Sequence, residues 1–366
     1  MAHCDVDSKP IIDFCSCVDQ VALKDGVVYF KYADGSLYIH GVNYAALVVL
    51  DLEVEGTGSF EFGVAAPRLI ATFKKLYSGS VRIFVTKTKV KLEAGNVSVS
   101  LGIVEYVECP VLPDMKPITG PVKDWMVESM VKCNFAATRV GDAVQGVLVD
   151  SGEFLRVCKM NVSSIRLITY PAQTLEAFRI YVPLESSKVF SKFKDSVQTI
   201  HYMPSKFGIE LESGVFVCLN TLEDTYPPDY VTALGMFNGL NVIADGVYGR
   251  YAFKTEDLNN ALDLANSVLG DDSPFVTLKL IGSEPSSGFP VWDIGGKSYD
   301  TCSVSEKLVC IEAGVADKVS FSVNRKDAAS ILKTYGEQVI IFNEGVRPLV
   351  CSTIEGLDVT MLLKVA

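Results

Sequence analysis

Apolar and polar residues follow one order that occurs three times along the chain. The clearest copy runs from Tyr181 to Asp229. Its pattern predicts an entry strand, an amphipathic helix with apolar residues three and four positions apart, and strands with an apolar residue at every second position. The turn TYPPD closes this copy. Segments that start near residues 62 and 321 repeat the same order.

Equivalent positions relate the three copies. Each opens on two apolar strand residues: Phe62 and Val64, Tyr181 and Val182, or Phe321 and Val323. The starts lie 119 and 140 residues apart, so the repeat has the size of a domain rather than of a solenoid unit. We therefore predict an α+β chain of three similar domains, at 1–118, 119–241 and 242–366.

Local signals place several elements between and within the repeats. Helices are expected at 67–77, 185–195 and 325–335, one in each copy. The sequence ADGS between two alternating runs predicts a tight hairpin, and a second turn is expected at Gly95 and Asn96. PVLPDMKP is expected to link two domains, and GSEPSSGFPVWDIGGKS is expected to be a loop.

Charge is distributed unevenly in this acidic chain. The net charge is −11, which by itself argues against binding to nucleic acid. The three repeat helices nevertheless hold nine basic and three acidic residues, a net +6, so the remainder carries −17. Lysine is common on solvated helix faces, but recurrence in all three helices favours a function. The basic positions are Arg68, Lys74, Lys75, Lys188, Lys192, Lys194, Arg325, Lys326 and Lys333.

Cysteine usage and hydropathy bear on the compartment. The ten cysteines are scattered and several lie in apolar runs, as is typical of reduced, buried thiols. They have no zinc-type spacing, so no metal or other cofactor is expected. No apolar run is long enough to span a membrane and the first residues do not resemble a signal peptide. We expect a cytoplasmic protein.

Motifs of enzymes are missing from the sequence. The three histidines are at 3, 40 and 201, and the last two fall in predicted strands. No nucleophile elbow, zinc-protease helix or glycine-rich dinucleotide turn is present. The pattern favours a protein that binds rather than catalyses. A hydrolase that uses His201 with Asp195 or Glu210 stays open as an alternative.

Four segments resemble one known family. VPLESSKVFSKF with the later turn at Tyr226, Pro228, Asp229 and Tyr230 resembles the end of the middle domain of the bacterial β sliding clamp, the processivity subunit of the replicative DNA polymerase (DNA polymerase III β subunit). The segment SSIRL matches the family's D-G-x-R-L at its arginine and leucine. FNEGVRPL is similar to F-N-D-P-L-R-P-L, and VTMLLKVA stands where the family has an apolar C-terminal tail.

The resemblance implies an architecture and a function. Clamps of this family are head-to-tail homodimers whose six domains form a ring, with antiparallel sheets outside and helices lining the hole. The repeat helices here would then contact duplex DNA through its phosphates without reading bases. Processivity would come from encirclement, and loading would need a separate ATPase.

The resemblance also implies a cleft that binds short linear peptides of the polymerase and the clamp loader. The residues carried over to it by position are Val144, Arg166, Leu167, Gly235, Val346, Met361, Leu362, Leu363, Lys364 and Val365. A non-enzymatic β-rich structural or assembly protein with repeated domains is the alternative, since it would share the repeats without needing a basic helix in each. A clamp encoded by a virus or plasmid is a further possibility within the class.

Overall fold

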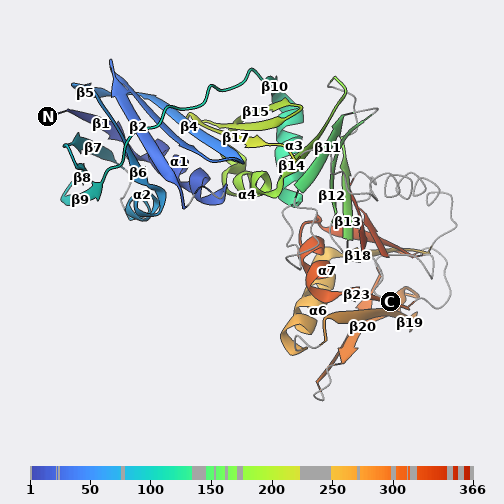
Figure 1. The fold of residues 1–366 in the computed structure, drawn as a ribbon. Coiled ribbons are helices and arrows are strands. Elements are labelled where there is room, and N and C mark those ends of the chain that lie inside the picture. Colours follow the sequence, from blue (N-terminus) through green and yellow to red (C-terminus); the bar gives the residue numbers. More distant parts are fainter. Residues whose placement is uncertain are drawn as a thin grey trace. The chain divides into compact units, whose positions relative to one another are not determined.

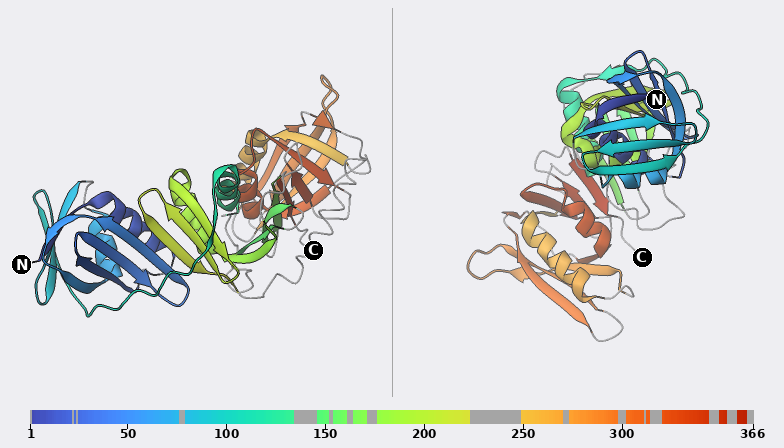
Figure 2. Two further views of the ribbon diagram at one scale, coloured as in Figure 1. Left: turned by 90° about the horizontal axis from the view of Figure 1, so that it is seen from above. Right: turned by 90° about the vertical axis from the view of Figure 1, so that its left-hand side faces the viewer.

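The computed structural model describes most of the chain (Figures 1 and 2). The described residues are 2–21, 23, 25–75, 79–133, 146–151, 154–160, 164–170, 176–222, 249–269, 273–297, 302–310, 312–313, 320–343, 349–352 and 358–362. Two compact units are formed, Met1–Val131 with Ile180–Glu223 and Lys132–Arg179 with Asp224–Ala366. None of the helices in these described ranges has the length and apolar character needed to cross a membrane.

A five-stranded antiparallel sheet lies at one end of the first unit. Its strand order is β5-β1-β7-β8-β9. Gly95, at a φ of 56°, provides the turn between the last two strands, as the sequence predicts. The strands are β1 (His3–Asp7), β5 (Glu55–Thr57), β7 (Ser80–Val85), β8 (Lys89–Ala94) and β9 (Val97–Gly102).

An eight-stranded antiparallel sheet, in the order β10-β15-β16-β17-β4-β3-β2-β6, forms the rest of this unit. The predicted ADGS hairpin is confirmed, because Asp34 and Gly35 both have positive φ, 52° and 83°, as a two-residue hairpin turn requires. The strands are β2 (Val27–Ala33), β3 (Ser36–Val42), β4 (Ala46–Glu53), β6 (Phe60–Ala65), β10 (Lys116–Ile118), β15 (Val197–Met203), β16 (Lys206–Leu211) and β17 (Val215–Asn220).

Helices cover one face of the eight-stranded sheet. α1 (Ser8–Gln20) packs against β4 and β17 and touches both α2 (Ala66–Phe73) and α4 (Leu184–Phe193). α3 (Gly120–Lys132) precedes the second unit, and a short 3₁₀ turn, η1 (Lys194–Ser196), follows α4. Stacked Phe30 and Phe62 lie in the core between helices and sheet, with ring centroids 5.0 Å apart.

The opposite face of the same sheet is crossed by the segment 103–115, called the strap here (Figure 1, teal trace). The strap has no regular secondary structure apart from one bridge between Gly63 and Val104. The linker that the sequence predicts, PVLPDMKP at 110–117, forms the end of the strap, but its last two residues, Lys116 and Pro117, belong to β10. A Cβ at Gly63 would lie only 2.8 Å from Val104 Cγ2. Glycine therefore permits the close approach of the strap to β6.

The second unit contains a nine-stranded and a four-stranded sheet. The orders are β14-β11-β12-β13-β26-β25-β24-β18-β22 and β21-β20-β19-β23. The strands of the larger sheet are β11 (Gly146–Ser151), β12 (Leu155–Met160), β13 (Ser164–Thr169), β14 (Phe178–Pro183), β18 (Gly249–Lys254), β22 (Glu312–Ala313), β24 (Gln338–Asn343), β25 (Leu349–Ser352) and β26 (Asp358–Leu362). Those of the smaller sheet are β19 (Phe275–Ser283), β20 (Pro290–Lys297), β21 (Ser303–Val309) and β23 (Ser320–Asn324).

Helices α6 (Thr255–Val268) and α7 (Arg325–Leu332) share the core of this unit with strands of both sheets. Trp292 is buried there, edge-on to Tyr251 at 4.8 Å between ring centroids. Trp292 belongs to β20, so the prediction of a loop over GSEPSSGFPVWDIGGKS is wrong for its second half. Trp292 and Ile294 alternate inward on β20, and this apolar burial outweighs the low strand preference of the neighbouring glycines.

All three repeat helices are present, and each is shorter than predicted. They end at Phe73, Phe193 and Leu332. In each case the predicted range extended into the turn that follows the last buried helical side chain. Helix ends are the least defined part of an amphipathic pattern, because apolar residues of the next turn continue the same spacing.

Candidate nucleic-acid interface and partner site

The basic side chains of the first two repeat helices lie on solvent-exposed faces. In α2, Leu69, Ile70 and Phe73 point into the core, which leaves the basic residues outside. In α4, Val189, Phe190 and Phe193 do the same. The exposed basic residues that result are Arg68, Lys74, Lys75, Lys188, Lys192 and Lys194. Because the apolar stripe faces the core, the spacing itself directs these cations to solvent.

The third repeat helix requires one correction. Lys326 and Lys333 of α7 are exposed. Arg325, the first residue of the helix, is only 1% exposed, and its Nη1 donates to the carbonyl oxygens of Ala265 at 3.0 Å and Asn266 at 3.2 Å in α6. These carbonyls lie near the C-terminal end of α6, where a cation is favoured. Arg325 therefore joins two helices and is removed from the predicted DNA contacts.

A lysine occupies the C-cap position of every repeat helix. These residues are Lys74 after α2, Lys194 after α4 and Lys333 after α7. The partial negative charge at a helix C-terminus favours a cation there. Two of the three also form ion pairs with the preceding helix, Lys74 with Asp19 of α1 and Lys333 with Asp263 of α6, both at 2.9 Å.

Much of the predicted peptide cleft lies outside the described residues. This applies to Val144, Gly235, Val346, Leu363, Lys364 and Val365. The backbone of Met361 and Leu362 belongs to β26, where it pairs with Ile165 and Ser164 of β13 on one side and with β25 on the other. The C-terminal segment is thus held inside the nine-stranded sheet up to Leu362.

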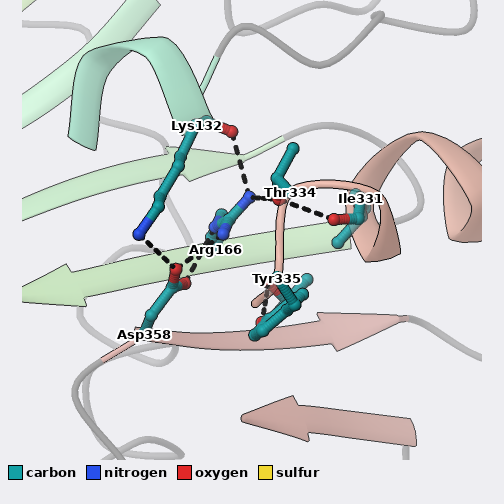
Figure 3. Close-up of polar contacts among 7 residues, drawn as sticks. Lys132, Arg166, Ile331, Thr334, Tyr335 and Asp358 are labelled. Atoms are coloured by element: carbon teal, nitrogen blue, oxygen red, sulfur yellow. Dashed lines mark hydrogen bonds and ion pairs between the residues drawn. The ribbon is translucent and has the colours of Figure 1, made fainter. Parts of the chain in front are cut away.

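Arg166 on β13 is fully buried in a network of polar contacts (Figure 3). Its guanidinium donates to both carboxylate oxygens of Asp358, from Nε at 2.9 Å and from Nη2 at 2.6 Å. Nη1 donates to the carbonyl of Lys132 at 3.0 Å and to Thr334 Oγ1. The ring of Tyr335 lies against the guanidinium, 5.0 Å from its carbon.

The rest of the network completes the bonding of these groups. Lys132 Nζ lies 3.7 Å from Asp358, and Tyr335 Oη donates to Thr360 Oγ1 at 2.8 Å. Burial by itself would lower the pKa of Arg166, but the charge of Asp358 and its hydrogen bonds raise it above its usual value. A charge removed from water is tolerated when it is paired with an opposite charge and hydrogen-bonded in this way.

The network changes the interpretation of Arg166. Its side chain is bonded within the fold and buried, and the neighbouring Leu167 is also buried at 7% exposure, so a structural role accounts for Arg166 in this chain. The partners were missed because Asp358 is 192 residues from Arg166. One signal was present: an aspartate at the start of the apolar run DVTMLL implies a buried partner of opposite charge.

The hydrolase alternative gains no support from the site around His201. His201 Nε2 lies 3.0 Å from Glu210 Oε2 on the neighbouring strand, and its ring stands edge-on to Phe216. Asp195 is exposed in η1. Within the described ranges, the His, Cys, Asp and Glu side chains form no cluster suited to a metal ion. The pair is a cross-strand contact on the strap side of the sheet.

Comparison with solved structures gives the fold. The β subunit of DNA polymerase III from Thermotoga maritima superimposes with a TM-score of 0.81 at 14% identity, with 100% of both chains covered. The sliding clamp of Bacillus subtilis gives 0.79 at 15% identity, with 100% of this chain and 99% of that one covered. The chain has the fold of a bacterial sliding clamp. The predicted α+β clamp architecture is confirmed.

Another solved clamp carries a bound peptide. The β clamp of Helicobacter pylori, bound to a DNA ligase peptide, matches with a TM-score of 0.75 at 13% identity over 100% of both chains. A scan against protein-family models and a search of curated proteins found no match. This chain therefore has the clamp fold although few of its residues are identical to those of the solved clamps, as expected when a pattern of buried positions rather than their identity specifies a core.

Proposed function

We propose that the chain is a DNA sliding clamp, a non-catalytic processivity factor that encircles duplex DNA and tethers the replicative DNA polymerase. One observation carries the proposal. In a chain of net charge −11, basic residues recur on the same helix of all three repeats, and every one except Arg325 is exposed. The full-length match to sliding-clamp structures supports the proposal, because the family that the sequence resembles has its helices lining the hole through which DNA would pass.

The charge distribution suits a protein that must hold DNA without stopping on it. Lysine and arginine attract phosphates irrespective of base sequence, and each contact is weakened by salt. The acidic remainder of the chain would repel DNA from the outside of the ring. Weak contacts inside and repulsion outside would leave encirclement as the main source of retention.

The proposed assembly is a head-to-tail homodimeric ring in the cytoplasm. Each chain would contribute three domains, at 1–118, 119–241 and 242–366. Exposed edges of sheets favour such association, because unpaired strand edges can continue a sheet into a neighbouring molecule. Since the sequence has no nucleotide-binding motif, a separate ATPase would open the ring for loading.

We also propose that short peptides of the polymerase and the clamp loader bind around the C-terminal segment that follows β26. The peptide-bound clamp of Helicobacter pylori supports a peptide site in this fold. Among the carried-over residues, Arg166 would act by holding β26 in place through Asp358. The remaining positions of the cleft stay predictions from the resemblance.

Topological retention on DNA tests the proposal without a clamp loader. The protein is incubated with linear duplex DNA that has cohesive ends, ligase closes the circle, and the complex is washed in high salt. We expect the protein to stay on the circle and to be released when a restriction enzyme cuts it. Light scattering should give the mass of two chains. A strict monomer, an open polymer or equal loss from circular and cut DNA would overturn the proposal, and an open polymer would favour an assembly protein.

A further inference from the structure

The three C-cap lysines stand in equivalent places but in different surroundings. Lys74 and Lys333 each follow the opening apolar residue of their repeat, Phe62 or Phe321, by twelve positions. Each ends the second helix of a packed pair, α1 with α2 or α6 with α7. Because the two lysines occupy equivalent positions, a feature that both share is a property of the repeated structure.

The shared feature is an aspartate on the first helix of each pair. Asp19 and Asp263 are 55 and 70 residues away from their lysines along the chain, yet both carboxylates lie 2.9 Å from the lysine Nζ. The lysine side chains are 59% and 52% exposed. Both ion pairs therefore lie on the solvent side of their helix pair, where a phosphate could compete with the carboxylate.

The position of Asp19 is unfavourable without its lysine. It is the next-to-last residue of α1, where the helix dipole disfavours a negative charge. The contact with Lys74 compensates for this. An asparagine would avoid the unfavourable charge, so the carboxylate calls for an explanation beyond the stability of α1.

Lys194 provides the contrast within the same chain. It caps α4 in the same way and is exposed. Within the described part of the chain it forms no ion pair of the kind made by Lys74 and Lys333. The three repeats thus present two lysines that are held by an aspartate and one that is not.

We propose that Asp19 and Asp263 attenuate the binding of duplex DNA by competing with phosphate for Lys74 and Lys333. This inference rests on the proposed clamp function. An exposed ion pair is weak, so each lysine could leave its aspartate to contact a phosphate. The free energy of that phosphate contact would be reduced by the free energy of the ion pair that is lost. Lys194 would make a full contact. The ring would then hold DNA unevenly and loosely, which suits sliding.

Asp19→Asn and Asp263→Asn are the variants that test the inference. Binding is measured by fluorescence anisotropy with a labelled linear duplex across a range of salt concentrations. We expect each variant to bind more tightly than wild type at low salt. Each released lysine should steepen the plot of log affinity against log salt by about 0.9, the increment for one added phosphate contact.

A double-mutant cycle identifies the lysine responsible. In the wild-type background, Lys74→Gln should weaken binding less than Lys194→Gln does. In the Asp19→Asn background, Lys74→Gln should remove the whole increase in DNA affinity that Asp19→Asn produced, because the released lysine is then absent. A gain that survives Lys74→Gln would overturn the inference.

Asp5→Asn is the matched control for net charge. Asp5 forms an exposed ion pair with Arg82 between strands β1 and β7 of the five-stranded sheet. Its replacement changes the net charge by the same amount as Asp19→Asn. Equal tightening by both variants would show a general charge effect and overturn the inference. If Lys194→Gln weakens binding while Asp19→Asn changes nothing, the inference about the aspartates fails and the proposed clamp function stands. If the protein is not retained on circular DNA, the proposed clamp function itself fails.

Discussion

Arg166 and Asp358 show how a buried charge can organise its surroundings. The guanidinium is shared among a carboxylate, a backbone carbonyl and a hydroxyl, and these come from β26, the end of α3 and the turn after α7. Replacing a buried ion pair with apolar residues can be neutral, but removing one partner leaves a charge without compensation. The position of β26 therefore depends on the hydrogen bonds between Asp358 and Arg166.

Asp358→Asn is expected to lower the free energy of unfolding by about 3–5 kcal/mol, because it leaves the buried Arg166 without a counter-charge. Urea denaturation followed by circular dichroism measures the change. Asp5→Asn is again a matched control, since Asp5 accepts two hydrogen bonds from Arg82 in the same bidentate manner but at an exposed site. Asp5→Asn should lower the free energy of unfolding by at most about 1 kcal/mol. Equal costs would contradict the assigned role of the network.

At the scale of elements, the strap is fastened to the eight-stranded sheet by aromatic and polar contacts. His40 on β3 is fully buried among Tyr29, Tyr38 and Tyr106, with ring centroids 5.1, 5.9 and 5.7 Å away. Tyr106 belongs to the strap. Next to it, Lys31 pairs with Glu108 at 3.0 Å, and Tyr38 Oη donates to Cys109 Sγ at 3.2 Å. The strap thus covers this face of the sheet, on which no helix of the described ranges lies.

Burial lowers the pKa of His40 below its ordinary value of 6.5. The unfolded chain therefore binds a proton at a higher pH than the folded chain, and stability should fall as the pH drops below about 6.5. His40→Phe removes the titrating imidazole, so the urea midpoint of this variant should depend less on pH between about 7 and 5 than that of the wild type. Tyr106→Phe keeps a ring against His40 and should retain the wild-type dependence. Parallel curves for wild type and His40→Phe would contradict the prediction.

At the scale of the whole molecule, the proposed function depends on the sum of positive charges from several helices, because one helix has too few of them. Each repeat helix presents two or three exposed cations, too few to hold DNA at physiological salt. A ring of two chains would multiply these contacts around one duplex, while the acidic remainder of the chain limits binding elsewhere. In the proposed clamp, an overall negative charge would therefore be compatible with binding to DNA.

Replacing both Lys188 and Lys194 of the α4 region with Glu should lower the slope of log affinity against log salt by about 1.8 for each chain of the ring, since two phosphate contacts per chain are lost. The lifetime on closed circular DNA should shorten, while the mass in solution stays that of a dimer. Lys87 and Lys89 are exposed at the turn between β7 and β8, and their replacement with Glu gives the same change in charge. If both pairs of replacements had the same effect, α4 would not be part of a DNA-binding face.

Local pattern was sufficient to predict a large part of this fold. Spacing of apolar residues identified the three repeat helices. Turn residues identified the ADGS and Gly95 turns, and prolines identified a linker, most of which lies in the strap. Each of these signals depends on neighbours within a few residues. It also directed Lys188 and Lys194 to solvent. The helix ends and β20 were misjudged, since apolar spacing continues past a helix and glycine in a strand is acceptable when its neighbours are buried.

Only the tertiary structure decided which charges are exposed and which are enclosed. Arg325 and Lys326 are adjacent in the sequence, yet one is buried against carbonyls of α6 and the other faces solvent. Asp19, Asp263 and Asp358 acquire their roles from partners 55, 70 and 192 residues away. The sequence by itself determined the repeats, the helices and their basic character. The pairing of charges was decided by packing, because the free energy of a charge depends on the atoms that surround it after the chain has folded.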